Sequence, residues 1–223
     1  MRWTLPNILT VLRLLAAPGV AVMFLYFHRP GADWLALVLF VVAAITDWFD
    51  GYLARLWQQE TKLGAMLDPI ADKAMVVIAL LVITGYSGMD PWLILPATLI
   101  LFREVFVSGL REFLGAKAGL LRVTMLAKWK TTAQMIAIAV LFLATGLEYV
   151  RERSQTRLPE QQYEAMIAAG PQDWNMVWIA AQGGWTAWVT GLALIWLAAI
   201  LTTISGWDYF SKARPYLREE GAK

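Results

Sequence analysis

The chain has 223 residues, of which 59% are hydrophobic and 16% charged, with a formal net charge of +2. Soluble domains average roughly 45–50% apolar residues, so this composition excludes an ordinary soluble enzyme, a disordered chain and a nucleic-acid-binding arm. There is no cysteine and one histidine, His28, which excludes disulfides, thiolate metal sites and His-rich metal sites. We expect an all-α integral membrane protein whose chemistry depends on carboxylates, hydroxyls, Arg, Lys and bound ions.

Six stretches are apolar and long enough, at about 20 residues each, to cross the hydrocarbon of a bilayer as helices. Short connections that contain Gly, Pro or charged residues separate most of them. We therefore predict one polytopic transmembrane domain over residues 1–223. The expected helices cover residues 8–27, 34–55, 66–86, 91–113, 130–149 and 186–207.

The distribution of positive charge predicts the orientation. With the N-terminus in the cytoplasm, twelve of the 19 Lys and Arg residues lie on the cytoplasmic side and four on the opposite side. This positive-inside bias places both termini in the cytoplasm. The first apolar stretch is a full span that contains Arg13, so we interpret it as a helix and not as a cleavable signal. The polar segment 150–174 is expected to be an extracytoplasmic excursion with one short helix starting at Pro159.

Acidic residues inside the expected spans are the main functional signal. Five such residues are present: Asp47, Asp50, Asp68, Asp72 and Glu104. An ionised carboxylate at the bilayer centre costs about 2.5–3.5 kcal/mol even on the lenient insertion scale, so acids here are functional candidates. Helical spacing puts one set of residues on one face of the second helix, and Asp68 and Asp72 on one face of the third. The set on the second helix is Asp47, Asp50, Gly51 and Ala54.

The second and third helices are joined by a short connection and must be antiparallel neighbours, so their four aspartates converge near the cytoplasmic surface. Such a cluster stays ionised only when cations neutralise it. Oxygen ligands favour Mg²⁺, Mn²⁺ or Ca²⁺, and two such ions can clamp the attacking and leaving oxygens of a displacement at phosphorus. Gly51 and Ala54 leave a groove for a nucleotide, and Arg55 can pair with a diphosphate.

The spacing of these residues resembles the signature of the CDP-alcohol phosphatidyltransferases. The pattern is Asp47-x2-Asp50-Gly51-x2-Ala54-Arg55-x8-Gly64-x3-Asp68-x3-Asp72. The surrounding segments PNILTVLR, TDWFDGYLAR, LGAMLDPIADK, LFREVFVSGLRE and KWKTTAQM are similar to the bacterial branch of this family that uses glycerol 3-phosphate. The resemblance covers residues 4–149, and the last helix matches by position alone.

The resemblance implies the CDP-alcohol phosphotransferase fold and a reaction in anionic phospholipid biosynthesis. The phosphatidyl group of CDP-diacylglycerol would pass to the 1-hydroxyl of sn-glycerol 3-phosphate, with release of CMP. Asp47, Asp50, Asp68 and Asp72 would bind two divalent cations, Mg²⁺ or Mn²⁺, and Asp72 would also act as the general base. The residues implied in CDP binding are Asp47, Asp50, Gly51, Ala54, Arg55 and Gly64. The family further implies a homodimer in the bacterial cytoplasmic (inner) membrane, with the site facing the cytoplasm.

The phosphate of the acceptor needs cations of its own. Arg103 and Arg111 are two helical turns apart and can face the same side, and Lys128 and Lys130 lie near the start of the fifth helix. Arg103 could instead pair with Glu104 or with an active-site aspartate, and the two lysines could simply reflect the positive-inside bias. Asn7, Thr10 and Arg13 could brace the head-group site, although a snorkelling Arg13 is an alternative.

Other functions remain open at this stage. Within the family, the acceptor could be inositol phosphate, serine, choline or phosphatidylglycerol, and the basic residues favour a small phosphorylated acceptor. From other classes, a divalent-cation transporter would need a polar route to both faces, whereas the outer halves of the second and third helices are apolar. A non-catalytic scaffold would leave the four aspartates unexplained.

Overall fold

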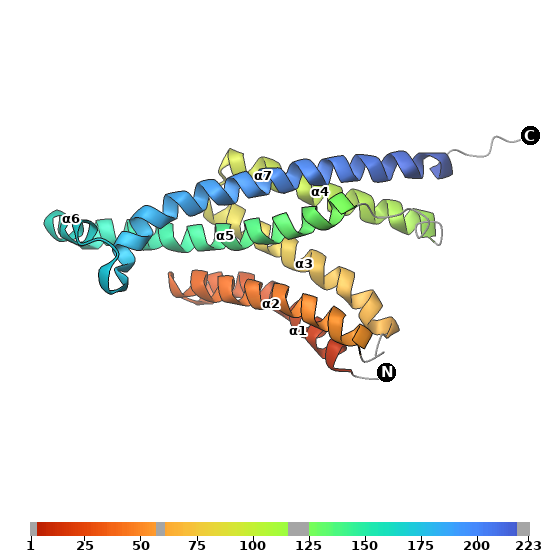
Figure 1. The fold of residues 1–223 in the computed structure, drawn as a ribbon, viewed down its shortest axis with the longest axis horizontal. Helices are drawn as coiled ribbons and strands as arrows, with labels where there is room; N and C mark the ends of the chain where they lie inside the picture. The colour runs from red at the N-terminus through yellow and green to blue at the C-terminus, as the bar shows by residue number, and fades with distance from the viewer. Residues whose placement is uncertain (1–3, 57–60, 116–124, 218–223) are drawn as a thin grey trace, which may run out of the picture.

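The structure, a computed structural model, describes residues 4–56, 61–115 and 125–217, except for the side chains of residues 48, 50–55, 125–128 and 173. The described chain is helical and contains no strand, which confirms the all-α fold class (Figure 1). Its elements are α1 Leu5–Tyr26, α2 Gly31–Leu56, α3 Lys62–Tyr86, α4 Pro91–Leu114, α5 Met125–Arg157, α6 Glu160–Ala168, the 3₁₀ turn η2 Gln172–Trp174 and α7 Met176–Leu217.

The helices form two groups that lie one above the other in Figure 1. In the first group α1 packs against α2 and α3, and in the second α7 packs against α5 and α4. Contacts of α2 and α3 with α5 join the groups. The start of α1 and the end of α7 lie at the same end of the molecule, and α6 lies at the opposite end. The end of α2 and the start of α3 also lie at the end of the molecule where α1 begins. The sequence predicted that these two helices pack against each other, but within the described residues each packs mainly against α1.

Local sequence signals explain where several helices begin. Pro6 occupies the first turn of α1 and Pro91 the first turn of α4, positions that do not need a backbone donor. The Thr61 side chain caps α3 by accepting a hydrogen bond of 3.0 Å from the backbone N–H of Gly64. The Asp90 side chain caps α4 in the same way, accepting from the N–H of Trp92 at 2.8 Å.

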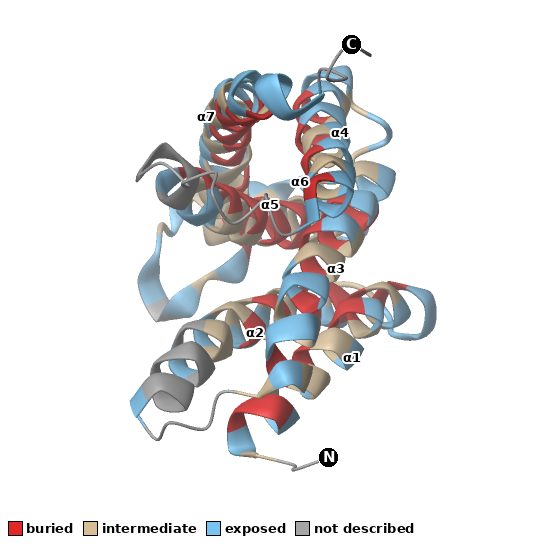
Figure 2. Cartoon of the chain, turned by 90° about the vertical axis from the view of Figure 1, so that its right-hand side faces the viewer, coloured by how far each residue is buried: buried red, intermediate tan, exposed pale blue. Residues whose placement is uncertain are grey.

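The core combines small residues with a few large rings. Fully buried alanines such as Ala17, Ala36 and Ala198 let the helix backbones approach closely. The space between the helix groups holds the rings of Phe40 and Phe142, whose centroids are 5.8 Å apart. The exposed residues lie on the outward faces of the helices (Figure 2), and many of them have large apolar side chains. An apolar exterior of this kind is stable in lipid, as expected for a membrane protein.

Four described helices are long and apolar enough to cross a membrane. They are α1, α4, the part of α5 from Trp129 to Arg157, and α7. Helix α3, which carries Lys62, Asp68, Asp72 and Lys73 in its first half, is not among them. Helix α2 is also not among them, and part of it lies outside the side chains that the structure describes. The structure thus supports a membrane protein, and the count of six spans stays a prediction.

The helix ends differ from the expected bounds around segment 150–174. Helix α5 continues to Arg157 instead of ending at residue 149, and α7 already begins at Met176. Hydropathy shows only where the apolar sequence ends. A helix can continue into a polar segment when side-chain pairs such as Glu148–Arg151 stabilise it. The expected short helix is present as α6, but Pro159 is its N-cap residue, with φ −55° and ψ 143°, and not its first helical residue.

Candidate active site

Three of the four signature aspartates converge on the first helix. The Nη1 atom of Arg13 contacts Asp47 Oδ1 of α2 and donates to Asp72 Oδ1 of α3 at 2.9 Å. The hydroxyl of Thr10, one turn earlier on α1, donates to Asp68 Oδ1 at 2.7 Å. Arg13 is 3% exposed and Thr10 is 2% exposed. Asp47, Asp68 and Asp72, which we call the acidic cluster, therefore face a single stripe of α1.

The start of α3 is tied to the same stripe. The Thr61 hydroxyl donates to Asn7 Oδ1 at 2.8 Å while it caps the helix. A Cβ atom at Gly64 would lie only 2.8 Å from Asn7 Oδ1. The glycine thus allows α1 to lie close to α3, which is a packing reason for this signature residue. Its expected role in CDP binding stays a prediction.

Several predicted ligands lie outside the described side chains, namely Asp50, Gly51, Ala54 and Arg55. Within the described residues, no three acids or histidines are grouped closely enough to hold a metal ion. The carboxylate oxygens of the acidic cluster are nevertheless ligands that suit a hard cation. Asp47 and Asp72 already share one positive partner, the Arg13 guanidinium, and Asp68 accepts from a hydroxyl. One guanidinium leaves these three carboxylates with excess negative charge that divalent cations can neutralise.

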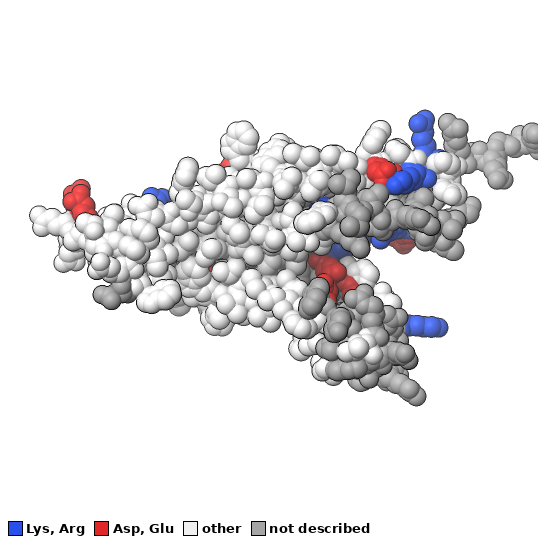
Figure 3. Space-filling view, viewed as in Figure 1, with Lys and Arg blue, Asp and Glu red and all other residues white. Residues whose placement is uncertain are grey.

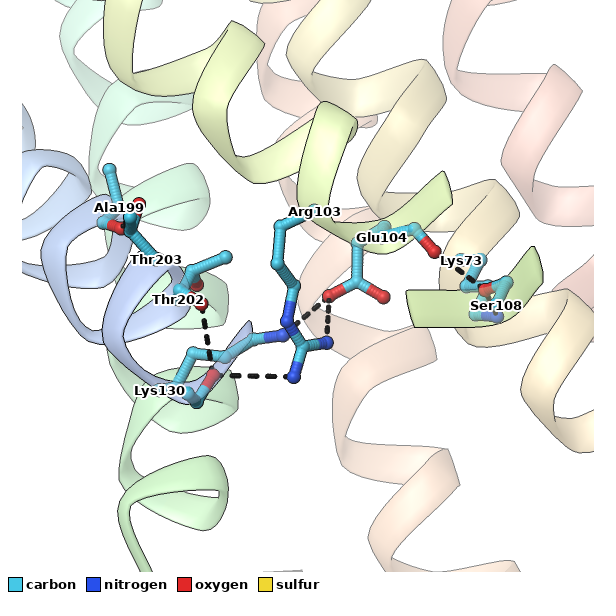
Figure 4. A network of polar contacts seen from close by, with 9 residues as sticks. Lys73, Arg103, Glu104, Ser108, Lys130, Ala199, Thr202 and Thr203 are labelled. Atoms are coloured by element: carbon cyan, nitrogen blue, oxygen red, sulfur yellow. Dashed lines mark hydrogen bonds and ion pairs between the residues drawn. The ribbon is translucent and has the colours of Figure 1, made fainter. Parts of the chain in front are cut away.

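Two of the four predicted acceptor residues, Arg103 and Lys130, meet at Glu104, as Figure 4 shows. Glu104 Oε1 accepts a hydrogen bond from Arg103 Nη1 at 3.2 Å and contacts Lys130 Nζ. Arg103 Nη2 reaches Ser205 Oγ of α7 at 3.2 Å. Arg103 therefore has the Glu104 partner that its sequence neighbourhood suggested, and the same carboxylate also binds Lys130, which is 5% exposed.

A third cation completes this basic cluster, which consists of Lys73, Arg103 and Lys130 around Glu104. Lys73 Nζ contacts Ser108 Oγ, and the Ser108 hydroxyl donates to the backbone carbonyl of Glu104 at 2.6 Å. Three cations around one carboxylate leave excess positive charge. Because Lys73 directly follows Asp72 on α3, the basic cluster adjoins the acidic cluster.

Of the other two predicted acceptor residues, the structure describes the side chain of Arg111, which lies at the edge of the basic cluster. The Arg111 guanidinium lies 5.3 Å above the ring of Tyr209, so Arg103 and Arg111 both face α7, as their spacing predicted. The side chain of Lys128 lies outside the described residues.

The contribution of α7 was missed by the sequence analysis. Thr202, Ser205, Gly206 and Tyr209 are all buried and follow the i, i+3, i+4, i+7 rule. They form one stripe, and its members Ser205, Gly206 and Tyr209 contact Arg103 or Arg111 of α4. The sequence signal that could have identified this face of α7 is the periodic stripe of small and polar residues in an otherwise apolar helix.

On the face seen in Figure 3, charged side chains lie toward the two ends of the molecule, more of them at the end where the two helix groups part, and the middle is almost uncharged. A separate cavity of about 520 Å³ is lined by Arg29, Tyr86, Glu148 and Trp185, among others. None of the acidic or basic cluster residues lines that cavity.

The sequence matches a known protein family. The profile of the CDP-alcohol phosphatidyltransferases matches residues 3–204. The chain belongs to this family. A relative from Cereibacter sphaeroides, named CDP-diacylglycerol–glycerol-3-phosphate 3-phosphatidyltransferase, is 69% identical over 222 residues, which are 99% of this chain and 100% of the relative. Proteins of the same name from Rickettsia bellii and Salmonella choleraesuis are 36% and 33% identical, over 95% and 99% of this chain and 96% and 100% of their own lengths.

Proposed function

We propose that the protein transfers the phosphatidyl group of CDP-diacylglycerol to the 1-hydroxyl of sn-glycerol 3-phosphate, producing phosphatidylglycerophosphate and CMP for anionic phospholipid synthesis. The observation that carries the proposal is the pair of adjoining clusters, one with excess negative and one with excess positive charge, joined by Asp72 and Lys73. A site that binds a nucleoside diphosphate donor beside a phosphorylated alcohol needs both. The name of the relative that is 69% identical supports the same reaction.

The acidic cluster would serve the donor. Asp47, Asp50, Asp68 and Asp72 are proposed to hold two divalent cations, Mg²⁺ or Mn²⁺, which would neutralise charge on the diphosphate. Gly51, Ala54, Arg55 and Gly64 would line the CDP groove together with Asp47 and Asp50. Asn7, Thr10 and Arg13 support this face through the contacts of α1 with α2 and α3.

Asp72 would act as the general base. Its carboxylate would take the proton of the acceptor 1-hydroxyl as the hydroxyl oxygen attacks the β-phosphorus, and CMP would leave. Arg13 holds one oxygen of this carboxylate at 2.9 Å, which fixes its orientation.

The basic cluster would serve the acceptor. Arg103, Arg111, Lys128 and Lys130 are proposed to bind the phosphate of glycerol 3-phosphate. Because Glu104 neutralises one charge of the cluster, the remaining positive charge within a membrane-embedded segment calls for an anion. Serine and choline carry no phosphate to supply it. Inositol phosphate and phosphatidylglycerol do, and the names of the relatives favour glycerol 3-phosphate over them.

For the membrane arrangement we propose six spans, α1 to α5 and α7. In this arrangement both termini and both clusters face the cytoplasm, and residues 150–174 lie outside a bacterial inner membrane. Helices α2 and α3 would cross because they pack against α1 and α5, which shields their charged residues from lipid. A homodimer is expected from the family.

A transporter function is less well supported by the packing. The half of α3 that lies beyond Asp72 is closed by buried apolar residues such as Ala79, Leu80 and Ile83. A polar route from the acidic cluster to the opposite face is therefore not apparent in the described chain.

The proposal is tested by CMP release from the detergent-purified protein with CDP-diacylglycerol and Mg²⁺ or Mn²⁺. Glycerol 3-phosphate is compared with inositol phosphate, serine, phosphatidylglycerol and no acceptor, and EDTA provides the metal-free control. We expect release that requires both glycerol 3-phosphate and metal. Release with another acceptor would change the assigned substrate. No release with any acceptor from folded protein would overturn the proposal and direct attention to metal flux in liposomes.

A further inference from the structure

Gly206 on α7 provides the surface against which Arg103 lies. A Cβ atom at Gly206 would lie 2.9 Å from Arg103 Cγ, 3.6 Å from Nε and 3.9 Å from Cδ. A Cβ atom essentially never comes this close to a non-bonded atom. Because Cγ belongs to the stem of the side chain and not to its flexible end, the whole Arg103 side chain would have to move. The absence of a side chain at Gly206 therefore determines where the Arg103 stem runs.

Ser205 fixes the other end of the same side chain. Its hydroxyl donates to the carbonyl of Thr202 at 3.0 Å, which leaves its lone pairs directed to accept from Arg103 Nη2 at 3.2 Å. Glu104 holds Nη1 at 3.2 Å. These contacts use two of the five N–H donors of the guanidinium, so it is fixed in position but keeps donors for a further anion.

We infer that Ser205 and Gly206 are positioning residues that aim Arg103 at the phosphate of the acceptor. The inference rests on the proposed function, in which Arg103 binds glycerol 3-phosphate, and it assigns a task to the last helix. A methyl group at Gly206 displaces Arg103 from this position and spoils its fit to phosphate. The donor site is on α1, α2 and α3 and does not depend on this contact.

The chain offers a matched control on the same helix. A Cβ atom at Gly191 would lie 2.7 Å from Leu141 Cδ2 and 2.8 Å from its Cγ. Gly191→Ala therefore introduces a steric overlap like that of Gly206→Ala, but against an apolar side chain in the core. Any effect that arises only from looser packing of α7 appears in both variants.

The experiment compares wild type, Gly206→Ala, Ser205→Ala and Gly191→Ala, each purified in detergent. Steady-state CMP release gives the KM for each substrate, and thermal unfolding gives stability. For Gly206→Ala we expect the KM for glycerol 3-phosphate to rise about tenfold while that for CDP-diacylglycerol changes less than about twofold. Ser205→Ala removes a hydroxyl without adding volume and shows a smaller rise of the same kind. Gly191→Ala lowers stability and leaves both KM values near those of wild type.

The outcomes separate this inference from the proposed function. A wild-type protein without glycerol 3-phosphate-dependent release overturns the proposed function, and the inference falls with it. An active wild type with equal changes of both KM values in Gly206→Ala, or with the same pattern in Gly191→Ala, overturns the inference alone. Should Gly206→Ala fail to fold, Ser205→Ala decides: an unchanged KM for glycerol 3-phosphate refutes the positioning role.

Discussion

Replacing Arg13 with alanine tests whether the acidic cluster is a cation site. Arg13 is 3% exposed, and its partners Asp47 and Asp72 are 44% and 52% exposed. Removing one partner of a buried ion pair costs about 3–5 kcal/mol. Because the carboxylates left behind are half-exposed, the expected loss of unfolding free energy falls between the values for exposed and buried pairs, about 2 kcal/mol. The loss leaves facing carboxylates without their internal counter-ion.

A divalent cation should replace much of this loss. A ligand that binds the folded state alone stabilises it by about 2.7 kcal/mol at 100 times its Kd. Without Arg13 the carboxylates attract Mg²⁺ more strongly, so Mg²⁺ should raise the melting temperature of Arg13→Ala more than that of wild type. The assay is thermal unfolding in detergent with EDTA or MgCl₂, followed by the fluorescence of the 12 tryptophans.

Arg29→Ala is the matched control. Arg29 donates to the fully buried Asp33 at 2.8 and 2.5 Å, away from the acidic cluster. Its loss should also destabilise the protein, but Mg²⁺ should give Arg29→Ala no more stabilisation than wild type. Equal rescue of both variants by Mg²⁺, or a loss in Arg13→Ala that Mg²⁺ does not reduce, would refute the cation-site argument.

Three further predictions concern individual residues. Asp72→Asn should reduce turnover by roughly 10²-fold or more with little change in unfolding temperature, because the amide keeps the shape but cannot accept the proton; normal turnover would exclude Asp72 as the base. Arg111→Ala should raise the KM for glycerol 3-phosphate more than that for CDP-diacylglycerol, and the opposite result would place Arg111 at the nucleotide. Thr10→Val removes the 2.7 Å hydrogen bond to Asp68; at about 1 kcal/mol, half-maximal activity should then need roughly fivefold more Mg²⁺, and an unchanged requirement would separate Asp68 from the metal site.

The convergence of Asp47, Asp68 and Asp72 could be predicted only in part. Helical periodicity places Asp68 and Asp72 on one face. The expected direct packing of the second helix on the third is not what joins them: within the described residues α1 packs against both α2 and α3, and its Arg13 contacts Asp47 and Asp72. The location of Arg13 was predicted less firmly, because a snorkelling arginine has the same spacing. Its burial and its two aspartate contacts now favour the bracing role.

The acceptor side could be predicted only in part. Arg103 and Lys130 were recognised as cations, but their shared partner Glu104 depends on how α4 and α5 each pack against α7. The contact between Arg103 and Ser205 joins residues 102 positions apart in the chain. Periodicity describes one helix at a time, so it cannot indicate which stripe of α7 faces α4.

The two clusters share an electrostatic design in which each keeps one counter-ion of its own. Arg13 lies among carboxylates, and Glu104 lies among cations. Complete neutralisation by the protein would leave no driving force for binding, whereas no neutralisation would make the folded state too costly within the membrane. A single counter-ion lowers that cost and leaves excess charge for the ligands to balance.

Asp72 and Lys73 are consecutive residues, so their side chains diverge by about 100° around α3 and point to different clusters. Cations at Asp72 and a phosphate near Lys73 would then be bound side by side. The cations would balance the negative charge of the acidic cluster, and the phosphate would balance the positive charge of the basic cluster. An acceptor without a phosphate leaves the basic cluster charged when the donor site is filled. If the basic cluster binds the acceptor as proposed, discrimination against such acceptors follows from this charge balance, and it should weaken when Lys130 is neutralised.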